Sequence, residues 1–403
     1  MEIATGWSDA ADSGEAVREA YALLAQRLSR RPSLVLAYYC EARSPEEIAR
    51  ALSRIAPEVP FHGGSSCLGL LTQDGFLYSE NGALALWGVH DPEGDYGVGF
   101  APDQKSPEEA GARATRKALR QASRPGESPS FIWINSAPGR EERVLEGIES
   151  VVGPNVPVMG GSTADDALQG RWSQIAPEGV ALEGVVLTAM FPSKEPGLSF
   201  HSGYAPTSRS GTVTSARERA IHRIDDRPAA QVYNEWTGGA LSPMLPQGGN
   251  VLHLTSWYPL GRARERIGNI PLYVLSHPER VLSDKGLTLF SEVHEGEELV
   301  LMAGNRDSLV KRAGRVAESA LYGFVSDASD PIQGGLMIYC GGTLLAVRDE
   351  AHRIWENIRL VLGNAPFLVV FTYGEQGRFL QGGNYHGNLM ISAVLFSDRD
   401  SVI

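Results

Sequence analysis

The chain has 403 residues, more than one hydrophobic core usually includes, so the length predicts two domains or one elaborated double domain. Hydrophobic residues make up 42 % and charged residues 21 % of the sequence, which is typical of a folded protein. The 48 acidic and 36 basic side chains leave a formal charge of -12. This charge argues against nonspecific binding to nucleic acid or to anionic lipid, because both need a basic protein surface.

The cysteines and the N-terminal segment indicate a reducing compartment. Cys40, Cys67 and Cys340 are an odd number and contain no C-x-x-C pair, so neither a disulfide framework nor a cysteine zinc site is expected. The first residues, MEIATGWSDAADSGE, lack the basic-then-apolar order of a signal peptide. No apolar run is long enough for a transmembrane helix. We therefore expect a cytoplasmic protein with reduced thiols.

The N-terminal region predicts a helix, a buried strand and a second helix. The first helix is expected over 13–29 and the short apolar strand LVLAYYC over 34–40. Ser44 suits the N-cap of the second helix, Pro45 its first helical position, and Glu47 completes a capping box.

A glycine-rich turn and a hairpin follow these elements. VPFHGGSS (59–66) predicts a second strand that enters a Gly-Gly-Ser turn. GFLYSENGALALWGVH (75–90) predicts two strands joined at Asn81-Gly82, a dipeptide typical of hairpins. The unit therefore reads helix–strand–helix–turn–hairpin.

The same order of elements then occurs a second time. A strand is expected at FIWIN (131–135), the turn recurs at VPVMGGST (156–163), and the hairpin recurs over 171–191. The duplicated units predict an α/β fold with mixed sheets covered by helices. The helices of this copy are expected over 106–123 and 140–153, so the internal repeats span 13–90 and 106–191.

The C-terminal half contains a third, less regular copy of this unit. GGLMIYC (334–340) and FLVVFTYGEQG (367–377) predict strands on either side of a helix over 348–363. The Gly- and Ser-rich segment 201–216 is the expected boundary, which gives two intimately packed domains, 1–220 and 221–403. Further elements expected here are a short helix over 228–238, a hairpin over 285–304 and a helix over 307–321.

The paired glycines have a functional and a structural interpretation. Backbone amides exposed at Gly63-Gly64-Ser65 and Gly160-Gly161-Ser162 can bind a carboxylate or phosphate, but the same residues are the default choice for tight turns. Asp165 and Asp166 can receive a ligand amine, and acids of this kind also occur in solvated loops.

The other candidates lie near predicted strand ends of the C-terminal half. Cys340 ends a buried strand and is a candidate nucleophile or haem ligand, or an inert buried thiol, and the same holds for Cys67. Tyr373 and Glu375 lie at a glycine-flanked turn where a pocket is expected, and Arg348 can pair with the carboxylate.

The histidines show no metal-binding spacing, so no metal site is expected. A haem needs only one axial ligand and leaves no motif, so His62 and His386 are the candidates for one. An enzyme with Cys340 or Cys67 as nucleophile and His386 or Glu375 as base remains a second hypothesis. A pure scaffold is a third.

Several motifs in this order resemble the FIST proteins (F-box and intracellular signal transduction). The resemblance extends over nearly the whole chain and implies an N-terminal and a C-terminal FIST domain. It is carried by GGSTADD (160–166), DDRPAAQVYNEW (225–236), LMIYC (336–340), FTYGEQG (371–377) and YHGN (385–388).

The resemblance implies a non-enzymatic sensory protein that binds a small ligand, such as an amino acid or a related metabolite. It also implies a haem-binding nitric-oxide sensor as the alternative within the family. A chain without room for a kinase or cyclase is expected to stand alone and to act through a separate signalling protein such as a histidine kinase. The residues assigned to the ligand site are Gly63, Gly64, Ser65, Gly160, Gly161, Ser162, Asp165, Cys340, Arg348, Tyr373, Glu375, His386 and Asn388.

Overall fold

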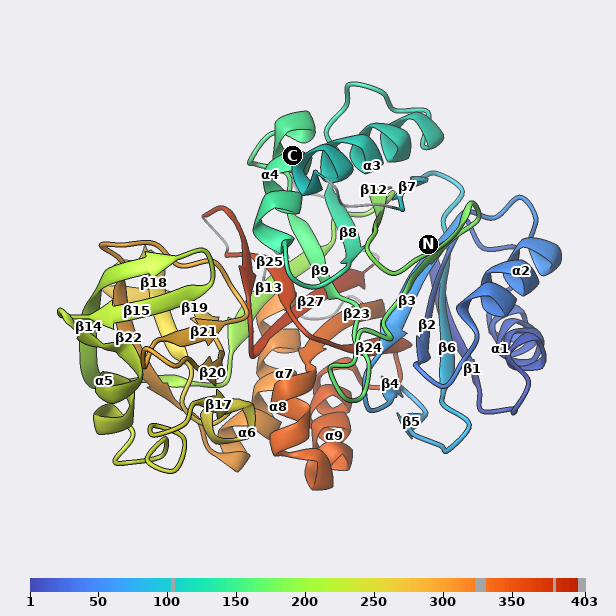
Figure 1. The fold of residues 1–403 in the computed structure, drawn as a ribbon. Helices are drawn as coiled ribbons and strands as arrows, with labels where there is room; N and C mark the ends of the chain where they lie inside the picture. The colour runs from blue at the N-terminus through green and yellow to red at the C-terminus, as the bar shows by residue number, and fades with distance from the viewer. Residues whose placement is uncertain (103–105, 323–330, 380–381, 398–403) are drawn as a thin grey trace.

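The computed structural model describes residues 1–102, 106–322, 331–379 and 382–397 (Figure 1). The described chain forms three six-stranded sheets and one nine-stranded sheet, flanked by helices. This confirms the predicted mixed α/β class. Among the described helices, none is both long and apolar enough to cross a bilayer.

The first repeat is built around a pair of parallel strands. β2 and β3 run parallel, and β6 pairs antiparallel with β2 and with the edge strand β1. Helices α1 and α2 cover the outer face of this sheet (Figure 1). Its elements are β1 (Glu2–Ser8), α1 (Ser13–Arg27), β2 (Leu34–Cys40), α2 (Pro45–Ile55), β3 (Phe61–Ser66) and β6 (Leu84–His90).

The second repeat has the same order. β8 and β9 are parallel, and β12 is antiparallel to β8 and to β7. Its elements are β7 (Asp95–Ala101), α3 (Pro107–Gln121), β8 (Phe131–Ser136), α4 (Glu141–Val152), β9 (Val158–Ser162) and β12 (Val185–Phe191).

The third, less regular copy is a complete repeat, with the same strand pairing as the first two. β23 and β24 are parallel, and β27 is antiparallel to β23 and to β13. Its elements are β13 (Gly197–Ser202), α7 (Arg306–Leu321), β23 (Ile332–Cys340), α8 (Gly341–Ala346), a 3-10 turn (Arg348–Glu350), α9 (Ala351–Leu362), β24 (Phe367–Thr372) and β27 (Met390–Ser397).

The helix boundaries follow the local sequence. The Ser44 hydroxyl accepts the amide of Glu47 at the start of α2, and Ser106 caps α3 in the same way through Glu109. These bonds satisfy amides that the first turn of a helix leaves unpaired. Gly153 ends α4 with a φ of 82°, which a residue with a side chain rarely adopts.

The three repeats exchange their hairpins in a ring. The hairpin of the first repeat joins β24 of the third, that of the second joins β3 of the first, and that of the third joins β9 of the second. Each repeat therefore completes the sheet of a neighbour. The exchanged hairpins are β4 (Leu70–Thr72) with β5 (Gly75–Leu77), β10 (Gln174–Ala176) with β11 (Gly179–Ala181), and β25 (Glu375–Arg378) with β26 (Asn384–Gly387).

This exchange corrects the hairpin predicted over 75–90. Both strands exist, but β5 pairs with β4 in the third repeat's sheet, whereas β6 pairs with β1 and β2. The residues around Asn81-Gly82 therefore connect two sheets. A turn sequence specifies a local reversal of the chain but does not choose the partners of the flanking strands.

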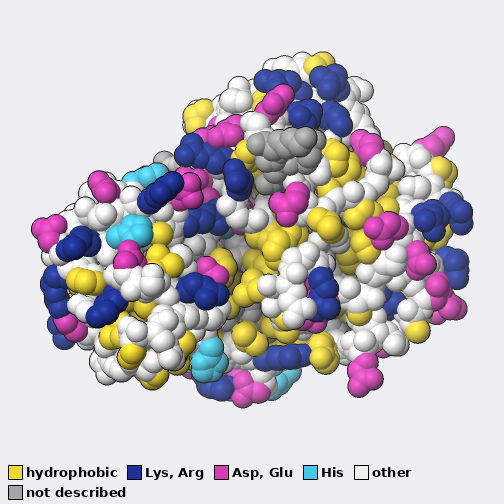
Figure 2. Space-filling model, viewed as in Figure 1, with side chains coloured by type: hydrophobic (Ala, Val, Ile, Leu, Met, Phe, Trp, Pro, Cys, Tyr) yellow, Lys and Arg dark blue, Asp and Glu magenta, His cyan; other side chains and the backbone are white. Residues whose placement is uncertain are grey.

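The nine-stranded sheet is inserted between β13 and α7 and lies at the left in Figure 1. In Figure 2, hydrophobic side chains gather in the middle of this face, between the inserted sheet and the first repeat. The elements of the insertion are β14 (Ala205–Arg217), β15 (Ala220–Ile224), β16 (Arg227–Pro228), α5 (Ala229–Trp236), β17 (Gly249–Asn250), α6 (Leu252–Thr255), β18 (Leu260–Ile267), β19 (Ile270–Ser276), β20 (Pro278–Val281), β21 (Leu287–Leu289) and β22 (Glu298–Ala303).

The segment 201–216, the expected domain boundary, contains the end of β13 and most of the long strand β14, and residue 220 is the first residue of β15. One further expectation is corrected here. The predicted hairpin over 285–304 does not form, because β21 pairs with β15 and β20 whereas β22 pairs with β14 and β18.

Candidate functional site

The C-terminal ends of β3, β9 and β24 meet at the centre of the three repeats. A residue one or two positions after the end of each strand donates a backbone hydrogen bond to another repeat, and the three bonds close a ring. The bonds run from Cys67 N to Phe371 O (3.1 Å), from Tyr373 N to Ser162 O (3.2 Å) and from Ala164 N to Ser65 O (3.1 Å).

The Gly-Gly-Ser segments are part of this arrangement, and they are strands rather than turns. A methyl group at Gly63 would overlap the carbonyl oxygen of Ala37 on β2. One at Gly161 would come within 2.6 Å of the Thr372 methyl group on β24. Glycine at these positions therefore permits neighbouring strands to approach closely.

A cavity of about 220 Å³ lies beside this ring, and we call it the junction cavity. All three repeats and the insertion contribute to its wall, which is mainly hydrophobic but carries two carboxylates, two thiols, one imidazole and one phenol. The lining residues are Cys67, Leu68, Asp165, Asp166, Ala167, Leu168, Leu252, His277, Phe290, Cys340, Gly341, Gly342, Leu345 and Tyr373.

Asp165 organises the loop after β9. Its buried carboxylate accepts the Tyr373 hydroxyl at 2.6 Å and the backbone amides of Ala167, Gln169 and Arg171 at 2.8–3.1 Å. Burial raises the pKa of Asp165, but these hydrogen bonds lower it by more, so the carboxyl is ionised. Its acceptor positions are used within the protein.

Asp166 is the more exposed of the two carboxylates. Its Oδ1 accepts the amide of Leu68 at 2.6 Å, and its own amide donates to Glu41 at 2.9 Å. The second carboxylate oxygen has no hydrogen-bond partner within the described parts of the chain. Asp166 can therefore accept a further hydrogen bond in the junction cavity.

Cys340 lies in the cavity wall, with Glu375 behind it. The Glu375 carboxylate accepts the Thr372 hydroxyl and the amide of Met390, both at 3.0 Å. Burial raises the pKa of Glu375 to about 8, so the group is mainly protonated at neutral pH. Burial and the neighbouring Glu375 also raise the pKa of the Cys340 thiol, and burial raises that of Cys67.

His277 presents an acceptor to the cavity. Its Nε2 lies 3.2 Å from the carbonyl oxygen of Leu252 and is therefore the protonated nitrogen. A methyl group at Gly342 would lie 3.5 Å from Nδ1, so that edge of the ring faces the cavity wall. Burial lowers the pKa of His277 to about 4, which keeps the ring neutral. Nδ1 has no hydrogen-bond partner in the described chain.

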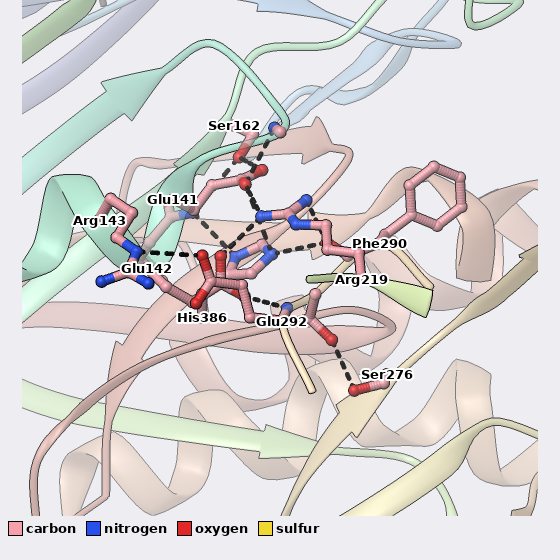
Figure 3. Close-up of polar contacts among 12 residues, drawn as sticks. Glu141, Glu142, Arg143, Ser162, Arg219, Ser276, Phe290, Glu292 and His386 are labelled. Carbon is pink, nitrogen blue, oxygen red and sulfur yellow. Dashed lines mark hydrogen bonds and ion pairs between the residues drawn. The ribbon is translucent and has the colours of Figure 1, made fainter. Parts of the chain in front are cut away.

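A charged cluster lies behind Phe290 and joins the insertion to the second repeat (Figure 3). Arg219, on the turn between β14 and β15, donates to Glu141 at 2.7 Å and to Glu142 at 2.6 Å, both on α4. Arg219 and His386 also contact the carbonyl oxygen of Phe290, at 2.6 and 3.3 Å.

Glu141, Glu142 and His386 also bring possible metal-ligand atoms within 4.8 Å of one another. The Arg219 guanidinium already bonds both carboxylates, so a cation is paired with them. Burial raises the pKa of Glu141, but His386 and Arg219 lower it by more, so the carboxyl is ionised. We interpret the cluster as a salt bridge between the insertion and the second repeat.

Two protein-family models together match most of the chain. The model of the FIST N domain matches residues 33–227, and that of the FIST C domain matches residues 229–378. The chain belongs to the FIST family. This family is associated with signal transduction and small-ligand sensing. The junction cavity is thus lined by residues of both FIST domains.

Similar individual proteins add little about the activity of this FIST protein. An uncharacterized protein of Methanocaldococcus jannaschii is 28 % identical over 188 residues, which are 45 % of this chain and 35 % of that protein. The match therefore spans about a third of the relative's length. Two solved structures of cyanuric acid hydrolase, one of them from A. caulinodans, cover 98 % of the chain at 11 and 12 % identity, with TM-scores of 0.37 and 0.35. At these scores the likeness carries no argument about activity.

The predicted site residues fall into separate groups in the FIST fold. Asp165, Cys340 and Tyr373 line the junction cavity, and Glu375 lies directly behind Cys340. Asn388 lies outside the lining and accepts the amide of His277 at 3.3 Å. The glycine and serine residues of the two Gly-Gly-Ser segments, at 63–65 and 160–162, are buried in β3 and β9 and do not line the cavity.

The remaining candidates lie away from the cavity. The guanidinium of Arg348 lies 4.7 Å from the ring centre of Tyr78, and within the described chain it forms no ion pair with Glu375. His62 is buried and bonds the Thr188 hydroxyl at 2.8 Å. His386 belongs to the charged cluster.

Sequence reasoning missed His277, Leu68, Phe290 and most of the apolar lining. His277 and Phe290 belong to the insertion, and no motif in their local sequence distinguishes them. Only the folding of the insertion against the repeats brings them to the cavity.

Proposed function

We propose that this FIST protein is a non-enzymatic sensor that binds a small metabolite, of the amino-acid-related class, in the junction cavity. The observation that carries the proposal is the composition of the wall, to which both FIST domains contribute. A ligand there contacts both domains at once, and its binding energy depends on their relative arrangement. Ligand binding can therefore shift the population of domain arrangements.

The charged cluster offers a physical connection from the cavity to the domain boundary. Phe290 contributes to the cavity wall, and its carbonyl oxygen is held by Arg219 and His386. Arg219 in turn bonds Glu141 and Glu142 on α4 of the FIST N domain. A displacement of Phe290 by ligand would act on this salt bridge. A separate signalling protein, such as a histidine kinase, would read the resulting arrangement.

The thiols favour binding over catalysis. A cysteine nucleophile acts as the thiolate, and burial raises the pKa of both Cys67 and Cys340. Neither thiol bonds a histidine in the described chain, and Glu375 behind Cys340 is mainly protonated at neutral pH because burial raises its pKa to about 8. Neither candidate base is therefore poised to activate a thiol. The candidate haem ligands His62 and His386 do not line the junction cavity.

The proposal is tested by native mass spectrometry of the purified protein, followed by thermal-shift measurements against a metabolite collection. A ligand at about a hundredfold its dissociation constant stabilises the folded state by about 2.7 kcal/mol. We expect at least one metabolite to raise the unfolding temperature and to appear as a stoichiometric adduct.

A pair of variants shows whether the binding occurs in the junction cavity. Leu345 lines the cavity from α8, so Leu345→Trp adds bulk there and should abolish the shift. Leu360 on α9 is 84 % exposed and does not line the cavity, so Leu360→Trp is the matched control. The proposal predicts a metabolite-induced rise in unfolding temperature that is lost in Leu345→Trp and retained in Leu360→Trp. If no metabolite gives this pattern, the proposal is refuted.

A further inference from the structure

The charged side chains around the junction cavity all carry the same sign. Asp165 and Asp166 lie in its wall, and no lysine or arginine is among the described residues that line it. A carboxylate on the ligand would face these aspartates without a cationic partner, whereas an ammonium would be attracted to both. The charge of the wall therefore disfavours an anionic ligand.

Backbone amides on the aspartate side of the wall do not supply the missing donors for a carboxylate. The amides of Leu68 and Ala167 already donate to the two aspartates. The amide of Leu168 donates to the Tyr373 hydroxyl at 2.9 Å. An anion would have to displace these internal bonds, and each displaced group would lose a buried partner.

Two acceptors remain for a ligand that donates hydrogen bonds. One is the second carboxylate oxygen of Asp166, and the other is Nδ1 of His277, which is 3 % exposed and faces Gly342. An ammonium has three N–H donors and no acceptor, so it complements this pair. The two groups come from the FIST N domain and from the insertion, respectively.

The hydrophobic residues of the cavity wall favour a ligand whose uncharged part is apolar. Leu68, Leu252, Phe290 and Leu345 make it largely hydrophobic, and the Phe290 ring lies 6.0 Å from that of His277. A cavity of about 150 Å³ suffices for benzene. The 220 Å³ here therefore accommodates one ring with a short chain.

We propose that the ligand of the junction cavity is a compact apolar amine without a carboxylate, with its ammonium bound by Asp166 and His277. This inference rests on the proposed function and narrows its ligand class from amino acids to amines. It follows from the charge, the bonded amides and the size of one cavity.

Isothermal titration calorimetry of the full chain with three ligands of the same ring tests this inference. Phenethylamine carries only an ammonium, phenylalanine adds a carboxylate, and phenylpropionate carries the carboxylate alone. We expect phenethylamine to bind at least about tenfold more tightly than either other compound, the effect of one charged hydrogen bond. Equal or tighter binding of phenylalanine or phenylpropionate would overturn the inference, as would undetectable binding of phenethylamine at millimolar concentration.

Two single-residue variants test whether Asp166 binds the ammonium group of the ligand. Asp166→Asn keeps an oxygen for the Leu68 amide but removes the charge, and it should weaken phenethylamine binding by about tenfold. Asp95→Asn, a partly exposed aspartate of the second repeat paired with Arg124, is the control and should leave binding unchanged. Equal effects of the two variants would refute the role of Asp166. The proposed function itself fails only if no metabolite gives a shift that Leu345→Trp removes.

Discussion

Removal of Arg219 tests whether the charged cluster holds the insertion against the second repeat. In Arg219→Met, Glu141 loses its guanidinium partner although its carboxylate is only 3 % exposed. The carboxylate retains the Ser162 hydroxyl at 2.8 Å and the Gly139 amide at 2.9 Å. Breaking a buried ion pair costs about 3–5 kcal/mol. Because these two hydrogen bonds remain, we expect a loss of about 3 kcal/mol in the free energy of unfolding.

The assay is urea denaturation followed by the fluorescence of the buried residues Trp87 and Trp133. Arg227→Met is the matched control, because Arg227 pairs with Glu235 on the exposed surface of the insertion. Exposed pairs contribute about 0–1 kcal/mol, so the control should differ little from the parent protein. An Arg219→Met variant as stable as Arg227→Met would refute the interpretation of the cluster.

The pH dependence of the unfolding free energy is an independent check on the Arg219–Glu141 ion pair. In the parent protein the pKa of Glu141 lies below its ordinary value of 4.5, so its stabilisation is present above that pH and is lost as the pH falls further. In Arg219→Met, burial is no longer offset by Arg219 and the pKa should rise. The stability difference between the two proteins should therefore narrow as the pH falls, and a constant difference would contradict this reasoning.

Three further predictions concern the core and the thiols. Cys67 and Cys340 should react slowly with iodoacetamide at neutral pH, because burial raises the pKa of both, and mass spectrometry should show labelling only after unfolding. Tyr38→Phe should cost about 1–3 kcal/mol in urea denaturation, because the Trp133 indole and Asn135 both lose their partner; an unchanged midpoint would contradict this. Gly63→Ala should prevent soluble expression, because its methyl group would overlap the Ala37 carbonyl oxygen, whereas Gly14→Ala, with no contact under 3.3 Å, should fold.

Much of the secondary structure follows from the sequence, because its determinants are local. Ser44 and Ser106 cap the helices that their patterns predict, and Gly153 ends α4. The apolar runs at 34–40, 131–136 and 367–372 became buried parallel strands. Caps and apolar periodicity act within a few residues, so they can be read along the chain.

The candidate site was only partly predictable. Asp165, Cys340 and Tyr373 lie at strand ends, and such positions indicate a site even without a structure. His277 and Phe290 lie in an insertion whose local sequence is ordinary, and the Gly-Gly-Ser segments proved to be strands that serve close packing.

The sequence by itself determined the repeated unit, the helix boundaries and the FIST resemblance, because each depends on residues close together in the chain. The tertiary structure decided which strands pair: β5 joins β24's sheet rather than β6, and each hairpin completes a neighbouring repeat. It also decided that Asp166 and His277 face one cavity. Partner choice depends on burial of surfaces far apart in sequence, and a local pattern does not encode that choice.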